Sequence, residues 1–516
     1  MTTTEARDLL AVARSRRPAG PAVRCGNQAL SYGDLDTLAA EMEAELHHAG
    51  ARPGDRVALL AANCHRYLAC YHAAIRTGVI LVPLNTRLAP PEQHAVLEHS
   101  GSSLLIGDQE RLAGPFGVFP DRGIGTPAGL AGWGLVRLAG GETGRSAPPD
   151  TAHLYYTSGT TGLPKGVILT RANLMAHVAM TLDELGFRGD DVWLHAAPMF
   201  HLADAWAVWT VTATSGTHVM LPRFEVAAAF DAIERHGVTI TNLVPTMLQA
   251  LVEEAERRRR PLPSIRLLLS GGAPIAPATV ARIGKALGCE YVQTYGLTET
   301  SPFLTFSILD AAIRSLSSEE QLRYRARTGR AARGVTLRVV DTTGDGLRDV
   351  PADDRAVGEV VVRGPTVTPG YWHDPAATAL AFRDGWFRTG DLGTLDGRGF
   401  LNLVDRVKDV IITGGETVYS TEVEHALHEH PAVREAAVFA APDDRWGEAV
   451  RAAVVLREGV LIDGTALVAF CRERIAGYKC PRQIDILPAL PRTGSGKIDK
   501  KAIREPFWRG RDRRIN

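Results

Sequence analysis

One short segment, TSGTTGLPKG at residues 157–166, combines glycines, hydroxyl side chains and a lysine. Glycines let a backbone approach an anion closely, while amide and hydroxyl groups donate hydrogen bonds to its oxygens. Lys165 adds a positive charge. Apolar runs typical of strands precede and follow the segment, which places it in a turn. The composition predicts a phosphate-binding loop, and the alternative is a flexible hairpin without a ligand.

The loop predicted at residues 157–166 is not a Walker loop. It lacks the Gly-x-x-x-x-Gly-Lys-Ser/Thr spacing, and a strand rather than a helix is predicted after it. The segment GSGKI near residue 494 is also a false match. Pro491 and Ile498 stand there in place of the glycine and the hydroxyl residue that the motif requires.

Five motifs follow one another along the chain: TSGTTGLPKG, YGLTET (295–300), RTGD (388–391), DRVKDVIITGGE (405–416) and PRTGSGKI (491–498). Their order and spacing resemble the ANL adenylating superfamily, in particular its AMP-dependent acyl-CoA synthetases (fatty-acyl and aryl-CoA ligases). The resemblance covers nearly the whole chain. It implies an enzyme that uses ATP and Mg²⁺ to convert a carboxylic acid into an acyl-adenylate and then forms a thioester with coenzyme A, releasing AMP and pyrophosphate.

The implied chemistry brings two anions together, because a carboxylate must attack the α-phosphorus of ATP. Charge neutralisation and positioning are therefore the main tasks. By resemblance, Tyr295 stacks on adenine, Thr298 contacts phosphate and Glu299 binds Mg²⁺ as a hard oxygen donor. The residues implied to hold the β and γ phosphates are Thr157, Ser158, Gly159, Thr160, Thr161, Gly162 and Lys165.

Further residues of the nucleotide site are implied near the C-terminus. Asp391 accepts hydrogen bonds from the ribose hydroxyls, and Arg406 reaches ribose or phosphate. Lys497 is implied to be a mobile catalytic lysine that bridges the carboxylate and the α-phosphate. Taken alone, Lys497 would be an ordinary surface lysine, and only the PRTGSGKI context gives it this role.

The resemblance also implies a coenzyme A site that forms when the C-terminal domain rotates about Lys408. Arg87 and Arg482 are further candidates for phosphate contacts, although a plain surface role fits them equally well. Cys480 stands where some relatives have a basic residue, which weakens the inferred nucleotide part of this site. The residues implied to contact coenzyme A are Gly414, Gly415, Glu416, Trp446 and Tyr478.

The carboxylic acid is expected between the segments PMFH (198–201), NLVPTM (242–247), SGGAP (270–274) and TYGL (294–297). His201 resembles a gate at the mouth of this pocket, and the alternative is a buried core histidine. Trp206, Trp209 and Met247 favour a bulky apolar acid, but they could equally belong to the core. Gly271, Gly272, Ala273, Pro274, Thr294 and Gly296 are counted with the nucleotide-binding residues.

The pattern of the chain predicts an α/β fold that positions these residues. Helix and strand patterns alternate over residues 32–83 and again over 230–269, whereas residues 107–150 have turn formers and predict a surface connection. Short β runs follow at 336–341 and 358–363. We expect a large N-terminal domain of two α/β halves plus a small β-rich subdomain (1–404), a hinge (405–409) and a small α+β C-terminal domain (410–516).

Composition excludes several classes of protein. Lys plus Arg (58) balances Asp plus Glu (58), so no net charge attracts nucleic acid. The basic run at 257–260 is interpreted as a solvated helix end. The six cysteines form no CxxC pair, and no apolar stretch approaches the roughly 20 residues of a membrane span. A cytoplasmic location is therefore expected, and the resemblance implies a monomer or homodimer.

Two alternatives remain open. The acyl group could pass to a carrier protein or a downstream acyltransferase instead of free coenzyme A. The chain could also be a nucleotide-binding scaffold without activity. The scaffold hypothesis predicts the loss of Lys497, Glu299 or Asp391, and all of these residues are present.

Overall fold

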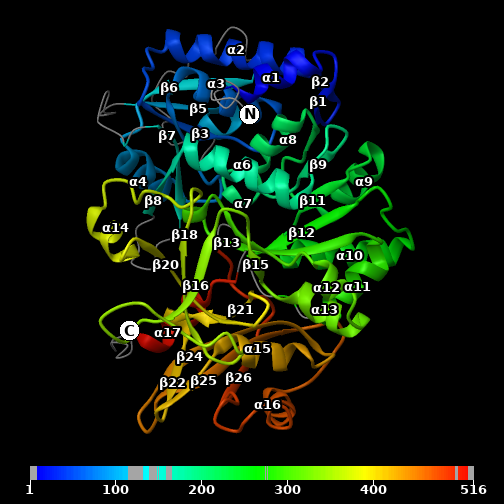
Figure 1. The fold of residues 1–516 in the computed structure, drawn as a ribbon, viewed down its shortest axis with the longest axis vertical. Coiled ribbons are helices and arrows are strands. Elements are labelled where there is room, and N and C mark those ends of the chain that lie inside the picture. The colour runs from blue at the N-terminus through cyan, green and yellow to red at the C-terminus, as the bar shows by residue number, and fades with distance from the viewer. Residues whose placement is uncertain are drawn as a thin grey trace. The chain divides into compact units, whose positions relative to one another are not determined.

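The computed structural model describes residues 8–113, 132–138, 148, 150–157, 165–272, 275, 277–493 and 498–509. The chain divides into two compact units (Figure 1). Unit 1 comprises Met1–Thr336 and Arg363–Phe387, and unit 2 comprises Leu337–Val362 and Arg388–Asn516. The hinge at residues 405–409 stays a prediction.

One sheet of unit 1 has the strand order β6-β5-β3-β4-β7-β8. Strands β5, β3, β4 and β7 run parallel, while β6 and β8 pair antiparallel at the two edges. Its strands are β3 (Arg56–Leu60), β4 (Ile80–Pro83), β5 (Leu104–Asp108), β6 (Trp133–Arg137), β7 (Thr151–Thr157) and β8 (Lys165–Thr170). The helices in this part of the chain are α1 (Leu9–Arg16), α2 (Tyr32–His48), α3 (His65–Thr77), α4 (Pro90–Ser100) and α5 (Gln109–Ala113).

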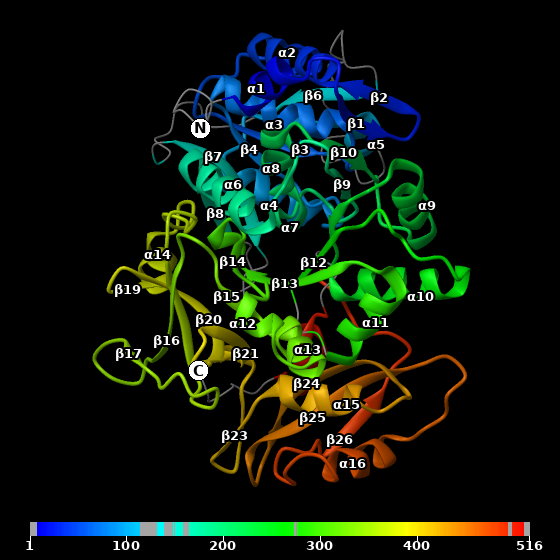
Figure 2. The same ribbon diagram turned by 45° about the vertical axis from the view of Figure 1, so that its right-hand side comes forward.

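The second sheet of unit 1 runs in the order β15-β14-β13-β12-β11-β9-β10-β1-β2 (Figure 2). Neighbouring strands are parallel from β13 to β1, and β2, β14 and β15 are antiparallel additions. The strands are β1 (Pro21–Cys25), β2 (Gln28–Ser31), β9 (Val192–His195), β10 (Thr217–Met220), β11 (Ile240–Asn242), β12 (Leu267–Gly271), β13 (Glu290–Gly296), β14 (Phe303–Phe306) and β15 (Gly329–Ala331).

Helices join these strands, as crossovers between parallel strands require. A short 3-10 helix, η2 (Thr298–Thr300), follows β13, and the small strand β19 (Phe382–Arg383) pairs with β20 (Trp386–Leu395). The remaining helices of unit 1 are α6 (Arg171–Leu185), α7 (Leu202–Ala205), α8 (Ala207–Thr214), α9 (Val226–His236), α10 (Pro245–Arg258), α11 (Pro277–Leu287), α12 (Ala311–Arg314), α13 (Ser318–Ala326) and α14 (Pro375–Ala381).

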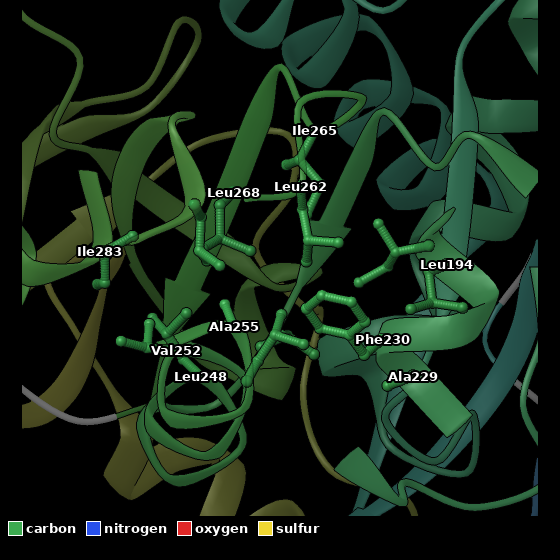
Figure 3. Packing of buried hydrophobic residues seen from close by; sticks show 14 of the residues in the cluster. Leu194, Ala229, Phe230, Leu248, Val252, Ala255, Leu262, Ile265, Leu268 and Ile283 are labelled. Atoms are coloured by element: carbon green, nitrogen blue, oxygen red, sulfur yellow. The ribbon is translucent and has the colours of Figure 1, made fainter. Parts of the chain in front are cut away.

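A large apolar core holds α9, α10 and α11 against the second sheet. Phe230 from α9, Leu248 from α10 and Ile283 from α11 are fully buried, and they share one cluster with Leu194 and Leu268 of the sheet. Figure 3 shows side chains of this cluster packed together. The cluster includes residues of β9 and β12 and residues on both sides of β11 (Ile240–Asn242), and the carboxyl ends of these strands lead into segments predicted to form the site.

Unit 2 contains a β-rich part and a C-terminal α+β part. The first has the strand order β17-β16-β18-β20-β21, and the second has the order β23-β22-β25-β24 with β26 beside β25. The elements are β16 (Thr336–Asp341), β17 (Arg348–Asp349), β18 (Gly358–Arg363), β20 (Trp386–Leu395), β21 (Phe400–Arg406), η3 (Val407–Asp409), β22 (Ile411–Thr413), β23 (Glu416–Val418), α15 (Ser420–His428), β24 (Val433–Asp443), β25 (Gly447–Leu456), α16 (Gly464–Arg472), β26 (Gln483–Ile486) and α17 (Lys500–Trp508).

The expected fold class is confirmed, and one element differs from the sequence prediction. Residues 107–150, expected to be a surface connection, contain strand β6, which pairs antiparallel with β5. Trp133 of β6 is buried, at 3% exposure. Only five residues form this strand, and glycines precede and interrupt it, so the apolar pattern is too short to stand out.

The basic run at 257–260 forms the end of α10, as expected. The helix ends at Arg258, and Arg259 adopts a left-handed conformation as its cap, with φ 55°. The neighbouring arginines pair with acids of the same unit: Arg257 with Glu254 at 2.6 Å, Arg258 with Asp231 at 2.5 Å and Arg260 with Glu234 at 2.9 Å.

None of the helices that the structure describes has both the length and the apolar character needed to cross a membrane.

Candidate active site

The predicted phosphate loop connects two paired strands of unit 1. Thr157, the last residue of β7, pairs with Lys165, the first residue of β8, and its hydroxyl donates a hydrogen bond to the Lys165 carbonyl at 3.5 Å. The antiparallel pairing brings the two ends of the loop together (Figure 1). Ser158, Gly159, Thr160, Thr161 and Gly162 lie outside the described residues.

The Lys165 ammonium lies over the ring of Tyr371, 5.1 Å from its centroid. The Tyr371 hydroxyl in turn donates a hydrogen bond of 2.9 Å to Oε1 of Glu299. Tyr371 therefore contacts both the end of the phosphate loop, through its ring, and the predicted magnesium ligand, through its hydroxyl. Burial and, secondly, the Glu299 carboxylate raise the pKa of Tyr371 above its usual value, so the hydroxyl keeps its proton and acts as donor.

Glu299 lies in a turn that follows β13, which we call the Glu299 turn (residues 298–301). The Leu297 amide donates to the Thr300 hydroxyl at 2.9 Å and holds the start of the turn. The Glu299 carbonyl accepts a hydrogen bond of 2.8 Å from the Thr368 amide. Glu299 and Thr298 are partly buried, so their side chains remain accessible to a ligand.

The donor set of this turn fits Mg²⁺ bound together with a nucleotide. In the parts of the chain that the structure describes, no group of three or more His, Cys, Asp or Glu side chains could hold a metal by itself. Mg²⁺ commonly takes only one or two carboxylates and completes its octahedron with phosphate oxygens and water. The Glu299 carboxylate beside the Thr298 hydroxyl matches that requirement, with the remaining ligands supplied by ATP.

Glycines at the carboxyl ends of β12 and β13 allow close packing of neighbouring backbone and side-chain groups, at the strand ends where parallel sheets commonly bind a ligand. Gly271 pairs with Thr294, and a Cβ on Gly271 would lie 2.5 Å from the Thr294 hydroxyl. Gly272 has φ +89°, a conformation that favours glycine. A Cβ on Gly296 would lie only 1.7 Å from the Pro302 carbonyl. Ala273 and Pro274 lie outside the described residues.

Tyr295 lies between Thr294 and Gly296 on β13. Its side chain is buried, at 8% exposure, and the strand pairs Tyr295 with Thr305 of β14. The structure therefore brings Thr294, Tyr295 and Gly296 to the same strand end as the Glu299 turn. The predicted stacking on adenine stays a prediction.

The segment expected to contact the acid is fixed by buried polar groups. The Met199 amide donates to Oδ1 of Asn63 at 2.9 Å, and the Asn63 amide donates to the Ala197 carbonyl at 2.8 Å. Helix α7 begins after His201, and its Asp204 contacts Nδ1 of His195 at 2.7 Å. These contacts hold residues 197–204 rigidly beside the end of β9.

His201 is partly buried, and its ring meets the edge of Phe200 at 4.6 Å between centroids. The Asn242 amide donates to the Ala203 carbonyl at 2.7 Å and so connects two of the segments predicted around the acid. Trp206 and Trp209 are 1% and 3% exposed, which places both in the core. Their presence therefore says nothing about the acid.

The predicted ribose contacts lie together in unit 2. Asp391 of β20 pairs with Arg406 of β21, and the Arg406 guanidinium lies 3.2 Å from Oδ1 of Asp391. Asp391 is 5% exposed, whereas Arg406 is exposed. Lys408, the predicted hinge residue, is exposed within η3. Lys497 lies outside the described residues, so its role stays a prediction.

Two of the residues predicted to contact coenzyme A, Gly414 and Trp446, contact each other on an exposed part of unit 2. The Trp446 ring packs against Gly414, where an added Cβ would lie 2.4 Å from a ring carbon. Arg445 and Arg482 lie over the same ring, 4.8 and 5.3 Å from its centroid. We call Gly414, Trp446, Arg445 and Arg482 the Trp446 surface. Its two guanidinium groups suit a ligand that carries phosphate.

Other predicted residues are distributed around unit 2. Gly415 has φ +87°, and Glu416 is exposed beside it. Tyr478 is 47% exposed, and Lys479 lies over its ring. Cys480 is 5% exposed and belongs to the C-terminal core, so it packs in the fold and does not face a ligand.

Tyr371, which follows Glu299 by 72 residues, was not among the predicted site residues. No local spacing connects the two positions, so only the fold reveals the contact. Arg87, a further candidate, is exposed after β4, and its amide donates to Oδ1 of Asn85 at 2.9 Å.

The chain matches the family model described as AMP-binding enzyme over residues 10–372 and the AMP-binding enzyme C-terminal domain over residues 422–497. A feruloyl-CoA synthase of Amycolatopsis sp is 40% identical over 500 residues, covering 95% of this chain and 96% of that protein. The fatty acid–acyl-carrier-protein ligase ScoC of Streptomyces coeruleorubidus is 35% identical over 512 residues, covering 97% of this chain and 96% of that protein.

A solved structure gives the same result. The o-succinylbenzoate CoA synthetase of Bacillus subtilis, in complex with its acyl-adenylate intermediate, superposes with a TM-score of 0.81 at 31% sequence identity. The match covers 96% of this chain and 97% of that chain. Fold, motifs and family models therefore agree, and the chain belongs to the AMP-binding enzyme family as an acyl-CoA synthetase of the ANL superfamily.

Proposed function

We propose that this enzyme activates a bulky, aryl-bearing carboxylic acid to its acyl-adenylate and then transfers the acyl group to coenzyme A. The observation that supports the proposal is the contact chain Lys165–Tyr371–Glu299, in which the cation proposed to bind phosphate and the carboxylate proposed to bind magnesium contact the same tyrosine. Adenylation needs both groups around the same triphosphate.

In the first half-reaction, the acid carboxylate attacks the α-phosphorus and pyrophosphate leaves. Lys165 and the loop that it ends bind the β and γ phosphates, and Asp391 with Arg406 holds the ribose. Glu299 and Thr298 would hold Mg²⁺, which would neutralise phosphate charge. Lys497 orients the carboxylate against the α-phosphate, where one positioned cation offsets the repulsion between two anions.

In the second half-reaction, a thiolate attacks the acyl carbon and AMP leaves. Lys497 withdraws as the C-terminal domain turns about Lys408, and Gly414 and Gly415 leave a narrow path for pantetheine. The Trp446 surface supports free coenzyme A as the acceptor, because two guanidinium groups flank an exposed aromatic ring there. A carrier protein is the second candidate, since ScoC, a relative, is a carrier-protein ligase.

The proposed acid class rests on relatives and not on the tryptophans. The feruloyl-CoA and o-succinylbenzoate CoA synthetases both act on acids that bear an aromatic ring. Trp206 and Trp209 are buried in the core and give no support to any acid. His201 is proposed as the gate of the acid pocket, beside Phe200. We further propose a cytoplasmic monomer or homodimer.

Mass spectrometry of the products tests this function. The enzyme is incubated with ATP, Mg²⁺ and a panel of hydroxycinnamic, benzoic, arylacetic and fatty acids, with and without coenzyme A. We expect acyl-AMP alone without coenzyme A and acyl-CoA with it, and the strongest signal from an aryl acid. Acyl-AMP in both conditions would move the acceptor to a carrier protein. A fatty acid as the best substrate would contradict the aryl class.

A further inference from the structure

A short segment of unit 1, residues 365–373, runs between the phosphate-loop hairpin and the Glu299 turn. We call it the strap. On one side it bonds to β8: the Ile168 amide donates to the Gly370 carbonyl at 3.1 Å, and the Trp372 amide donates to the Gly166 carbonyl at 2.7 Å. The Thr368 hydroxyl also donates to the Ile168 carbonyl at 2.6 Å. The strap is thus attached to β8 along its length.

On its other side the strap holds the Glu299 turn. The Thr368 amide donates to the Glu299 carbonyl at 2.8 Å, and the Ser301 hydroxyl donates to the Thr366 carbonyl at 2.7 Å. These bonds fix the backbone of the turn without using the Glu299 side chain. The carboxylate itself is oriented by the Tyr371 hydroxyl, at 2.9 Å.

We infer that Tyr371 is a positioning residue for the magnesium–nucleotide site, its hydroxyl orienting the Glu299 carboxylate and its ring placing the Lys165 ammonium. The inference rests on the proposed function of this site. The hydroxyl donates to Oε1 of Glu299 and so orders the carboxylate before Mg²⁺ binds. The ring attracts the Lys165 ammonium by a cation–π interaction and keeps it near the same phosphates.

The competing explanation is that Tyr371 only braces the fold. Its backbone pairs with Val167, and the strap bonds described above do not involve its hydroxyl. Removing the hydroxyl alone should therefore leave the strap in place. Tyr371→Phe makes that change, because the ring stays over Lys165. Tyr32→Phe is a matched control, since the Tyr32 hydroxyl is buried and donates to the Gly216 carbonyl at 2.6 Å.

The experiment measures Mn²⁺ binding in the presence of a non-hydrolysable ATP analogue by electron paramagnetic resonance, with thermal unfolding as a parallel readout. We expect Tyr371→Phe to weaken Mn²⁺ binding about tenfold, as loss of the partner of a ligating group commonly does. Tyr32→Phe should lower thermal stability and leave Mn²⁺ affinity unchanged. Tyr371→Leu should in addition weaken binding of the metal-free analogue about two- to fivefold through Lys165.

Coupling to Glu299 decides between positioning and bracing. If Tyr371 acts through that carboxylate, Tyr371→Phe should cost no further Mn²⁺ affinity in a Glu299→Gln background. Equal losses in both backgrounds, or wild-type affinity in Tyr371→Phe, would overturn the inference. If Tyr371→Phe does not fold, Tyr371→His keeps a ring and a donor, and its Mn²⁺ affinity should lie within threefold of wild type. A greater loss would overturn the inference. Wild-type enzyme that binds no Mn²⁺ with the analogue would overturn the proposed function as well.

Discussion

The Glu299 turn of unit 1 and the Trp446 surface of unit 2 are built in opposite ways. The turn is held by hydrogen bonds to its backbone and its carboxylate, and glycines beside it have no room for a side chain. The Trp446 ring is 36% exposed, and it contacts a glycine and two arginine side chains. The first is ordered before a ligand binds, whereas the second presents exposed side chains to a ligand.

This difference suggests where each half-reaction is sensitive. Adenylation depends on fixed groups around a triphosphate, so small changes in unit 1 should have large effects. Thioester formation depends on an open surface whose long side chains can adjust, so changes there should have smaller effects.

Lys497→Ala is expected to have the largest effect and is the strongest challenge to the contrast, because this unit 2 residue is proposed to act in adenylation. The rate of acyl-AMP formation should fall about 100- to 1000-fold, as loss of one positioned charge-stabilising group commonly causes. The measurement is the formation of acyl-AMP without coenzyme A. Lys501→Ala, at an exposed position nearby, is the control and should match wild type. A normal rate in Lys497→Ala would remove the lysine from the mechanism.

A pair of glycine substitutions compares the packing of the two regions. In Gly296→Ala the new Cβ would lie 1.7 Å from the backbone carbonyl of Pro302, and that carbonyl cannot move alone. The substitution should therefore lower the unfolding free energy of unit 1 by about 1–3 kcal/mol and shift the Glu299 turn. In Gly414→Ala the Cβ meets the end of the Trp446 side chain, which can turn away.

Gly414→Ala should therefore cost only the penalty of a left-handed alanine, about 1–2 kcal/mol, and leave acyl-AMP formation intact. Gly284→Ala is the control for the substitution itself, because nothing lies within 4 Å of its new methyl group. Urea unfolding of each variant measures the change. Equal losses of adenylation in Gly296→Ala and Gly414→Ala would contradict the contrast.

Low pH should reduce the unfolding free energy of unit 1, because its buried histidines resist protonation. Burial lowers the pKa of His72 from 6.5 to about 4, and this side chain is 2% exposed. As the pH falls, His72 therefore takes up a proton in the unfolded chain before it does so in the folded protein. The contribution of neutral His72 to the unfolding free energy is complete above pH 6.5 and is lost as the pH falls toward 4. Between pH 7 and pH 5 this one residue should cost about 2 kcal/mol.

Urea unfolding followed by tryptophan fluorescence checks this pH effect. The difference in unfolding free energy between pH 7 and pH 5 should shrink by about 2 kcal/mol in His72→Gln. His48→Gln, at an exposed position, should keep the wild-type difference. An unchanged difference in His72→Gln would mean that the buried histidine does not contribute to acid sensitivity.

Much of the fold could be predicted because its elements have local signals. Helix α2 begins at the Ser31–Asp34 capping box, and α3 ends at Gly78 with φ 73°. Strand β6 had too few residues to show a pattern. Trp206 and Trp209 could not be assigned from sequence, because a large apolar residue has the same appearance in a core and in a pocket.

The same distinction holds for the candidate site: residues within a local motif could be predicted, and residues without one could not. The motifs identified Lys165 and Glu299, because each lies in a run of residues whose order resembles a known family. Tyr371 had no such context, since its contact with Glu299 spans 72 residues and exists only after the strap pairs with β8. The burial of Cys480 was likewise invisible, because it depends on how the C-terminal sheet and its helices pack.

The central claim is that adenylation depends on the Glu299 turn and thioester formation on the Trp446 surface. Rapid-quench measurement of acyl-AMP and acyl-CoA in the same samples tests this claim most directly. Glu299→Gln should lower acyl-AMP formation about 100-fold. Trp446→Ala should form acyl-AMP at the wild-type rate and transfer the acyl group to coenzyme A about tenfold more slowly, with Trp508→Phe as a control in unit 2. Normal acyl-AMP formation in Glu299→Gln, or loss of acyl-AMP in Trp446→Ala, would contradict the account.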